Sequence, residues 1–108
     1  MSKPRTWISN ANPAAGEVVR VRALIEHPME SGLRLDVEGN DIPRNIVNTF
    51  EAALDGELLF RWQPETAISQ NPYIEFTFAA QRSGELQLKW LDDEGVVIID
   101  ALPISLAS

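Results

Sequence analysis

The sequence contains no cysteine among its 108 residues. This absence excludes disulfides, iron–sulfur clusters, thiolate zinc sites and thiol nucleophiles within the chain. A single histidine, His27, limits imidazole chemistry to one position. No serine lies in a nucleophile-elbow context, and no glycine-rich phosphate loop is present. The sequence therefore predicts no catalytic residue and no cofactor, and we expect the protein not to be an enzyme.

Positive charge is also scarce. Nine lysines and arginines stand against 16 aspartates and glutamates, which gives a formal net charge of −7. A field of that sign repels phosphate backbones and anionic lipids, so we expect neither nucleic acid nor membrane as a partner. No apolar run approaches a membrane span, and the first residues lack the apolar core of a signal peptide. The length and the hydrophobic content of 44% predict a single globular domain over residues 1–108.

Alternation of apolar and polar residues with a period of two dominates the chain, which is typical of half-buried strands. The alternating segments are residues 5–9, 17–26, 45–54, 58–62, 73–80, 86–90 and 96–106. Asp55-Gly56 between two of them is a strong hairpin signal. With no amphipathic helix in the pattern, the sequence predicts an all-β fold, an antiparallel immunoglobulin-like β-sandwich of about seven strands. A small closed barrel is the alternative.

Three features suggest how the predicted strands are used. The last segment is apolar on both parities at its start and contains Pro103, which cannot donate to a strand ladder, so we expect its later part to lie at an edge or a bulge. We expect a partner to cover an apolar edge of this kind. Trp62 and Trp90 fall on inward parities and are predicted to lie in the core. Trp7 lies near the terminus, where a large aromatic side chain more often anchors a partner.

The connection between the second and third segments, residues 27–44, is far longer than the usual loop of about 4–6 residues. It begins with the run HPMESG and ends with IPR. Gly39-Asn40 predicts a turn that folds this connection into a small flap. A long loop of defined composition is more often functional than passive, so the candidate site is placed here.

Two arginines in this connection, Arg34 and Arg44, stand out on an acidic protein. Their guanidinium groups are suited to holding a carboxylate or an oxyanion such as a sulfur oxoacid. The alternative is that each is part of a solvated charged surface. The carboxylates of Asp92 and Asp93 fall in a predicted turn, where such groups are usually solvated.

His27 and Met29 raise a second hypothesis, that of a copper carrier. Imidazole and thioether are both copper ligands, and two residues apart on an extended chain they point to the same side. The alternative, which we favour, is that His27 ends a strand with its ring hydrogen-bonded while Met29 packs into the base of the loop. We therefore predict no metal site.

With these residues in place, the chain resembles the SoxZ family, the Z subunit of the SoxYZ carrier in bacterial sulfur oxidation. The resemblance extends from Gly16 onward and rests on matches to residues 27–32, 34, 36, 42–44, 46, 50, 55–56, 67–73 and 90–95. The run HPMESG at residues 27–32, together with IPR at residues 42–44, is specific to the family. Asp41 departs from it, because members often carry a basic residue there, so no charge contact at that position is carried over.

The resemblance implies a non-catalytic subunit of a heterodimeric sulfur-carrier complex. The implied partner is a SoxY-like subunit, whose C-terminal arm carries sulfur intermediates of thiosulfate oxidation on a cysteine. Pathway enzymes would contact the complex transiently. The resemblance also implies a periplasmic location, reached by export together with the partner. A generic immunoglobulin-like interaction module is the remaining alternative.

We place the surface for the partner and the pathway enzymes on six side chains of the long connection: His27, Met29, Glu30, Arg34, Asp36 and Arg44. Three further residues are expected to fix its backbone: Pro28, Gly32 and Pro43.

Overall fold

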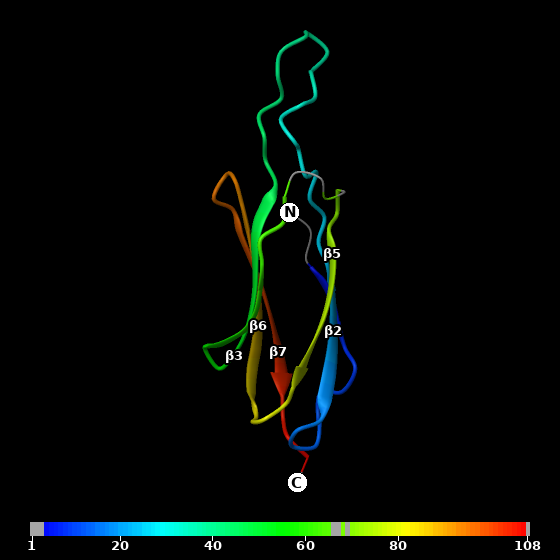
Figure 1. The fold of residues 1–108 in the computed structure, drawn as a ribbon, viewed down its shortest axis with the longest axis vertical. Helices are drawn as coiled ribbons and strands as arrows, with labels where there is room; N and C mark the ends of the chain where they lie inside the picture. Colours follow the sequence, from blue (N-terminus) through cyan, green and yellow to red (C-terminus); the bar gives the residue numbers. More distant parts are fainter. Residues whose placement is uncertain (1–3, 66–67, 69, 108) are drawn as a thin grey trace.

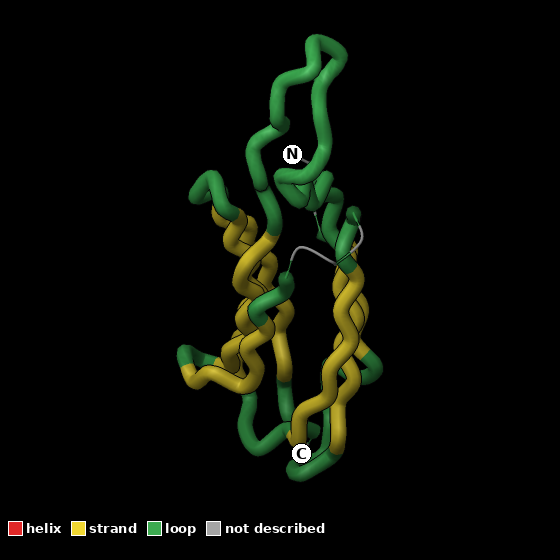
Figure 2. Tube along the Cα trace, turned by 45° about the horizontal axis from the view of Figure 1, so that its top comes forward, coloured by secondary structure: helices red, strands yellow, loops and turns green. Residues whose placement is uncertain are grey.

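A computed structural model describes residues 4–65, 68 and 70–107, and it shows two antiparallel sheets packed face to face (Figures 1 and 2). The smaller sheet has the strand order β1-β2-β5, and the larger sheet has the order β4-β3-β6-β7. The strands are β1 (Arg5–Ile8), β2 (Val18–Leu24), β3 (Val47–Leu54), β4 (Glu57–Trp62), β5 (Tyr73–Ala79), β6 (Gly84–Asp92) and β7 (Val97–Ile104). Within the described part of the chain, no helix has the length and apolar character needed to cross a membrane.

The predicted all-β, immunoglobulin-like sandwich is confirmed. Each of the seven alternating segments forms a strand, and the Asp55-Gly56 turn joins β3 to β4 as predicted. The barrel alternative is wrong, because neither sheet closes on itself and the described strands leave four edges, at β1, β5, β4 and β7.

The core lies between the two sheets and is filled by the apolar residues of alternate positions. In β2 the residues at odd positions are buried, whereas Val18 and its even-numbered neighbours face outward. Phe50 occupies the centre, with ring centroids 5.0 Å from Trp90 in its own sheet and 6.0 Å from Phe76 in the other. Such tilted pairs contribute about 0.5–1.5 kcal/mol each beyond their buried area. Trp90 is buried and Trp62 packs against the core, as predicted.

β7 is an edge strand of the larger sheet, as the sequence predicts, and it pairs only with β6. Its inward residues Ile98 and Leu102 pack against the core. Its outward residues Val97 and Ile99 remain 49% and 52% exposed. The apolar character of both parities therefore has two causes: one set of side chains closes the sandwich, and the other lies on the outer surface.

Between β2 and β3 the chain leaves the sandwich as a narrow projection, the flap (residues 28–44), which extends the molecule to 61 × 21 × 20 Å (Figure 1). Its two arms meet at an isolated bridge between Leu35 and Asp41. Beyond that bridge, the N–H of Asp36 donates to the carbonyl of Asn40 at 2.8 Å. The flap predicted from the Gly39-Asn40 turn is therefore confirmed.

Candidate functional site

The base of the flap is built around His27, which is only 3% exposed. Its Nε2 lies 3.1 Å from Oδ2 of Asp92, at the end of β6. Its Nδ1 accepts a hydrogen bond from the backbone N–H of Met29 at 3.0 Å. Because Nδ1 is an acceptor, the ring is neutral and its proton is on Nε2, which donates to the Asp92 carboxylate. One ring thus joins the continuation of β2, the start of the flap and the opposite sheet.

Met29 is buried beside this ring in a left-handed conformation, with φ of 50°. That conformation costs a non-glycine residue on the order of 1–3 kcal/mol, and the hydrogen bond to His27 holds it in place. The thioether sulfur lies 3.3 Å from the backbone nitrogen of Val47, at the start of β3. The predicted hydrogen-bonded histidine ring and packed methionine are confirmed. The expectation that His27 ends the strand is wrong, because β2 ends three residues earlier, at Leu24.

The copper hypothesis assumed an extended chain from His27 to Met29, and the positive φ shows that this assumption is wrong. Both ring nitrogens of His27 are also engaged, one by a backbone N–H and one by a carboxylate. Binding a metal there requires breaking a buried hydrogen bond. Among the described residues, no group of three or more histidine, aspartate or glutamate side chains is placed to hold a metal ion.

The sequence predicted that the carboxylates of Asp92, the last residue of β6, and Asp93, in the turn that follows, are solvated. That prediction is wrong for Asp92, which is buried, whereas Asp93 stays partly exposed. Asp92 is 6% exposed, and its Oδ1 accepts the backbone N–H groups of Glu94 at 3.0 Å and Val96 at 2.9 Å. Asp93 points instead toward the flap, with its own N–H donating to the carbonyl of Ile46 at 3.0 Å. Both carboxylates therefore organise the backbone around them.

Asp93 binds Arg44 with both oxygens, Nε to Oδ2 at 2.7 Å and Nη2 to Oδ1 at 3.1 Å. The same carboxylate accepts the N–H of Ile46 at 3.2 Å and the amide of Asn48 at 2.9 Å. The hydrogen bond from Arg44, helped by those from Asn48 and Ile46, lowers the pKa of Asp93 to about 2. The returning arm of the flap is thus held to the β6–β7 turn by a carboxylate that stays charged.

The two arms of the flap approach each other closely near its base. Glu30 and Asn45 exchange backbone hydrogen bonds of 2.8 Å in both directions. Gly32 has φ of 86°, and a Cβ placed on it would lie 3.2 Å from Cβ of Arg44. Only glycine meets both conditions without strain, because it has no side chain and tolerates positive φ. Pro28 is on the outgoing arm, and its predicted role in the backbone stays a prediction.

Arg34 forms an ion pair with Glu30 on the outgoing arm, and its Nε lies 3.3 Å from Oε2 of that residue. This hydrogen bond lowers the pKa of Glu30 and raises that of Arg34. Arg44 is similarly paired with Asp93. The hypothesis that both guanidinium groups hold an oxyanion is therefore not supported, since a neighbouring carboxylate neutralises each one.

The tip of the flap is shaped by Asp36, whose Oδ1 accepts the N–H groups of Glu38 and Asn40, both at 2.9 Å. The tip, residues 33–41, exposes apolar side chains to solvent: Leu33, on the arm before the turn, is 88% exposed, and Val37, within the turn, is fully exposed. Sequence reasoning did not assign these residues to the surface. Their exposure could have been inferred from the predicted flap, because two arms of this length have no second layer against which apolar side chains can be buried.

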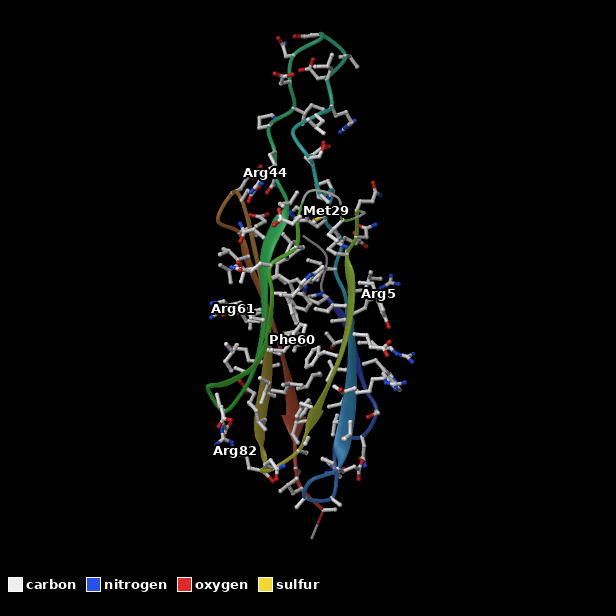
Figure 3. The ribbon with its side chains drawn as sticks, in the orientation of Figure 1. Arg5, Met29, Arg44, Phe60, Arg61 and Arg82 are labelled. Carbon is white, nitrogen blue, oxygen red and sulfur yellow. The ribbon has the colours of Figure 1, made fainter. Side chains whose placement is uncertain are left out.

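Four of the six side chains predicted to form the interaction surface are at least partly open to solvent: Glu30, Arg34, Asp36 and Arg44. The placement of the other two needs correction, because His27 and Met29 are buried beneath that surface and support it. Figure 3 shows Met29 at the base of the flap and Arg44 beside the β6–β7 turn. Pro43 is exposed on the returning arm. Whether these residues contact a partner stays a prediction.

Several solved structures share this fold. Superoxide reductase (neelaredoxin) from Ignicoccus hospitalis superposes with a TM-score of 0.67 at 12% identity, over 98% of this chain and 81% of that chain. A variant of that enzyme gives a TM-score of 0.71 at 15% identity, over 97% and 80%. The crystal structure of CHIR-AB1 gives 0.62 at 17% identity, over 99% and 100%. At these identities the likeness shows the fold alone.

No curated protein matches the chain by sequence. A family model, by contrast, matches residues 8–100, and its description is "Sulphur oxidation protein SoxZ". The matched region contains the flap, the His27–Asp92 contact and the Arg44–Asp93 ion pair. Because this match covers most of the chain, the protein belongs to the SoxZ family and has a role in the Sox system of sulphur oxidation.

Proposed function

We propose that this chain is the non-catalytic subunit of a heterodimeric sulfur carrier. Membership of the SoxZ family supports a role in sulphur oxidation. The sequence has no thiol on which a sulfur intermediate of thiosulfate oxidation can travel. In this proposal a SoxY-like partner supplies the cysteine, on a C-terminal arm, and the present chain holds that partner in position for the pathway enzymes.

The observation that carries the proposal is the outer side of β7. This strand of eight residues has one unpaired edge, and its outward residues Val97 and Ile99 are half exposed. In the register with β6, Val97 lies beside Leu91, which widens the apolar area. Long apolar edge strands invite pairing with another chain, and a stable interface needs an apolar centre of this kind. A second sandwich packed against β7 fits both needs.

Co-purification tests this interface. A tagged SoxY-like subunit from the same organism is expected to retain the wild-type chain and to lose the Ile99→Asp variant, because a buried unpaired carboxylate opposes association. Leu58→Asp is the matched control. Leu58 is 47% exposed on the outer face of the same sheet, but on the opposite edge strand, β4. Retention of Ile99→Asp together with loss of Leu58→Asp would place the partner elsewhere and remove the support from β7.

We further propose that the tip of the flap contacts the pathway enzymes. It projects away from the sandwich and carries Leu33, Leu35 and Val37 in a setting where they cannot be buried within the chain (Figure 1). Val37→Ser is expected to leave the heterodimer intact and to slow sulfur oxidation in the reconstituted pathway. Val18→Ser, at an exposed apolar residue of β2, is the control. Equal rates for both variants and the wild type would contradict a role for the tip.

The proposal includes a periplasmic location, reached by export together with the partner. Its support is the family assignment, since the complex is expected to meet the enzymes of its pathway in one compartment. Cell fractionation with and without the partner tests this location. The chain is expected in the periplasmic fraction only when the partner is present.

A further inference from the structure

The outer face of the smaller sheet differs in charge from the rest of the chain. In β2 and β5 the inward residues are apolar and buried, so the polar residues lie on the outer face. The charged residues of β1, β2 and β5 are three arginines and one glutamate: Arg5, Arg20, Arg22 and Glu75. Three positive charges against one negative charge give these strands a net charge of +2, and Glu26, just beyond β2 at one end of the face, lowers it to +1, whereas the whole chain carries −7.

The strand register brings these side chains into contact. Arg22 pairs with Trp7 on β1 and with Glu75 on β5. The two oxygens of Glu75 lie 3.4 Å from Nε of Arg20 and 3.3 Å from Nε of Arg22, so one carboxylate is shared by two guanidinium groups. The guanidinium carbon of Arg22 lies 4.7 Å from the centroid of the Trp7 ring. Stacking uses the flat face of a guanidinium group and leaves its in-plane N–H groups directed at carboxylates.

Aromatic side chains flank this positive charge on both outer strands. Trp7 on β1 and Tyr73 on β5 are each about half exposed, and the Tyr73 hydroxyl donates to Glu75 at 2.8 Å. Tryptophan, tyrosine and arginine are the residue types that contribute most at the centres of protein interfaces. At one end of the face, Arg5 and Glu26 line a hollow of about 200 Å³. Figure 3 shows Arg5 on the side of the smaller sheet that faces away from the larger one.

We propose that this face binds an acidic segment of a polypeptide, in which carboxylate side chains flank an apolar one. The carboxylates contact Arg5, Arg20 and Arg22, and the apolar side chain lies over β2 between Trp7 and Tyr73. An anionic membrane fits this face less well. Each basic residue gains little near such a surface, and the charge of −7 on the whole chain opposes the approach. The inference does not depend on the proposed function, since β7 belongs to the other sheet.

Fluorescence anisotropy with the full chain tests the proposal, using a labelled peptide of alternating glutamate and leucine and its lysine–leucine counterpart at about 0.15 M ionic strength. The glutamate peptide is expected to bind more tightly. In the double variant R20Q/R22Q, the Kd for the glutamate peptide is expected to rise roughly tenfold, because two exposed ion pairs with the peptide are lost. Glu75→Gln is expected to tighten binding, because it removes the carboxylate that competes for both arginines. A merely structural role of these residues would not give opposite signs.

Arg61→Gln is the matched control, because Arg61 is similarly exposed and forms an ion pair with Glu51 on the larger sheet. Equal affinity for the two peptides, or an equal loss in R61Q and R20Q/R22Q, would overturn the proposal. Weaker or unchanged binding of the glutamate peptide by E75Q would also overturn the proposal. This outcome can be read even if circular dichroism shows that R20Q/R22Q is unfolded. Vesicles of phosphatidylcholine and phosphatidylserine in equal parts complete the test. Arginine-dependent binding to vesicles without peptide binding assigns the face to membranes and refutes the acidic polypeptide.

Discussion

Arg44 and Asp93 are 49 residues apart in the sequence and face each other as a two-point ion pair, with Nε to Oδ2 at 2.7 Å and Nη2 to Oδ1 at 3.1 Å. Planar, two-point pairing of this kind is among the stronger polar contacts in proteins. It joins the returning arm of the flap to the turn between β6 and β7. The contact therefore fixes the direction in which the flap leaves the sandwich.

The lowered pKa of Asp93 predicts a specific dependence of stability on pH. Its pKa in the folded protein is about 2, below the ordinary value of 3.8. The unfolded chain therefore binds this proton more readily than the folded one, so the contribution of Asp93 to the free energy of unfolding is present above its ordinary pKa. That contribution is lost as the pH falls from 3.8 toward 2. Urea unfolding measured at several pH values gives the slope of the free energy of unfolding against pH.

Asp93→Asn is the control for this slope, because the amide keeps the size of the side chain and does not titrate. We expect the difference in stability between wild type and variant to shrink as the pH falls through this window. A constant difference across it would show that the Asp93 carboxylate has the same pKa in both states. The comparison cancels the other carboxylates, since both proteins contain them.

The tautomer of His27 gives a second prediction. In the wild type, one oxygen of Asp92 faces the Nε2–H donor of His27, and the other accepts the backbone N–H groups of Glu94 and Val96. Asp92→Asn replaces one of these two acceptor oxygens with an NH2 group, which is itself a donor. The amide cannot serve all three donors with one oxygen, and the ring cannot switch its proton because Nδ1 accepts from Met29. A buried donor left without a partner costs about 1–3 kcal/mol. Denaturant unfolding of Asp92→Asn at neutral pH should show a loss of that size.

Replacing the ring itself should cost more. His27→Phe removes both the donor to Asp92 and the acceptor for the N–H of Met29, so two buried groups lose their partner. We expect a loss of about 2–5 kcal/mol, at the upper end for a single substitution. A variant as stable as the wild type would mean that water or another side chain replaces the ring at no cost.

Two glycines of the flap separate strain from steric contact. Gly32 and Gly39 have nearly the same positive φ, 86° and 84°, but only Gly32 has a neighbour within 4 Å of an added Cβ. Alanine at either position pays for the unfavourable φ, on the order of 1 kcal/mol. Gly32→Ala must in addition push Arg44 away, so it should be the more destabilising substitution. Paired thermal unfolding curves check the order, and equal losses would contradict the close approach of the two arms.

The strands were predictable because each one has a buried face, and burial of alternate residues leaves a pattern that single sequences retain. Val19 and Phe76 lie where the alternation places them. The turn at Asp55-Gly56 was predictable for a similar reason, since few residue pairs suit a tight hairpin. Local rules were sufficient for both.

The contacts at the base of the flap were not predictable from local rules. His27 and Asp92 are 65 residues apart, and nothing near Asp92 in the sequence distinguishes a buried carboxylate from a solvated one. The left-handed φ of Met29 is equally invisible, because methionine has no preference for it. The sequence predicted the flap itself and, at its base, a hydrogen-bonded histidine ring with a packed methionine. It did not show which side chains face solvent and which are buried beneath them.

The attachment of the flap has a mechanical consequence. Asp93 grips the returning arm, and Asp92, its neighbour, holds the N–H of Val96, the residue before β7 begins. Tilting the projection therefore pulls on the short turn from which the last strand starts. A molecule bound at the tip and another that covers the β7 edge of the larger sheet would therefore be coupled mechanically through residues 93–96, the turn between β6 and β7.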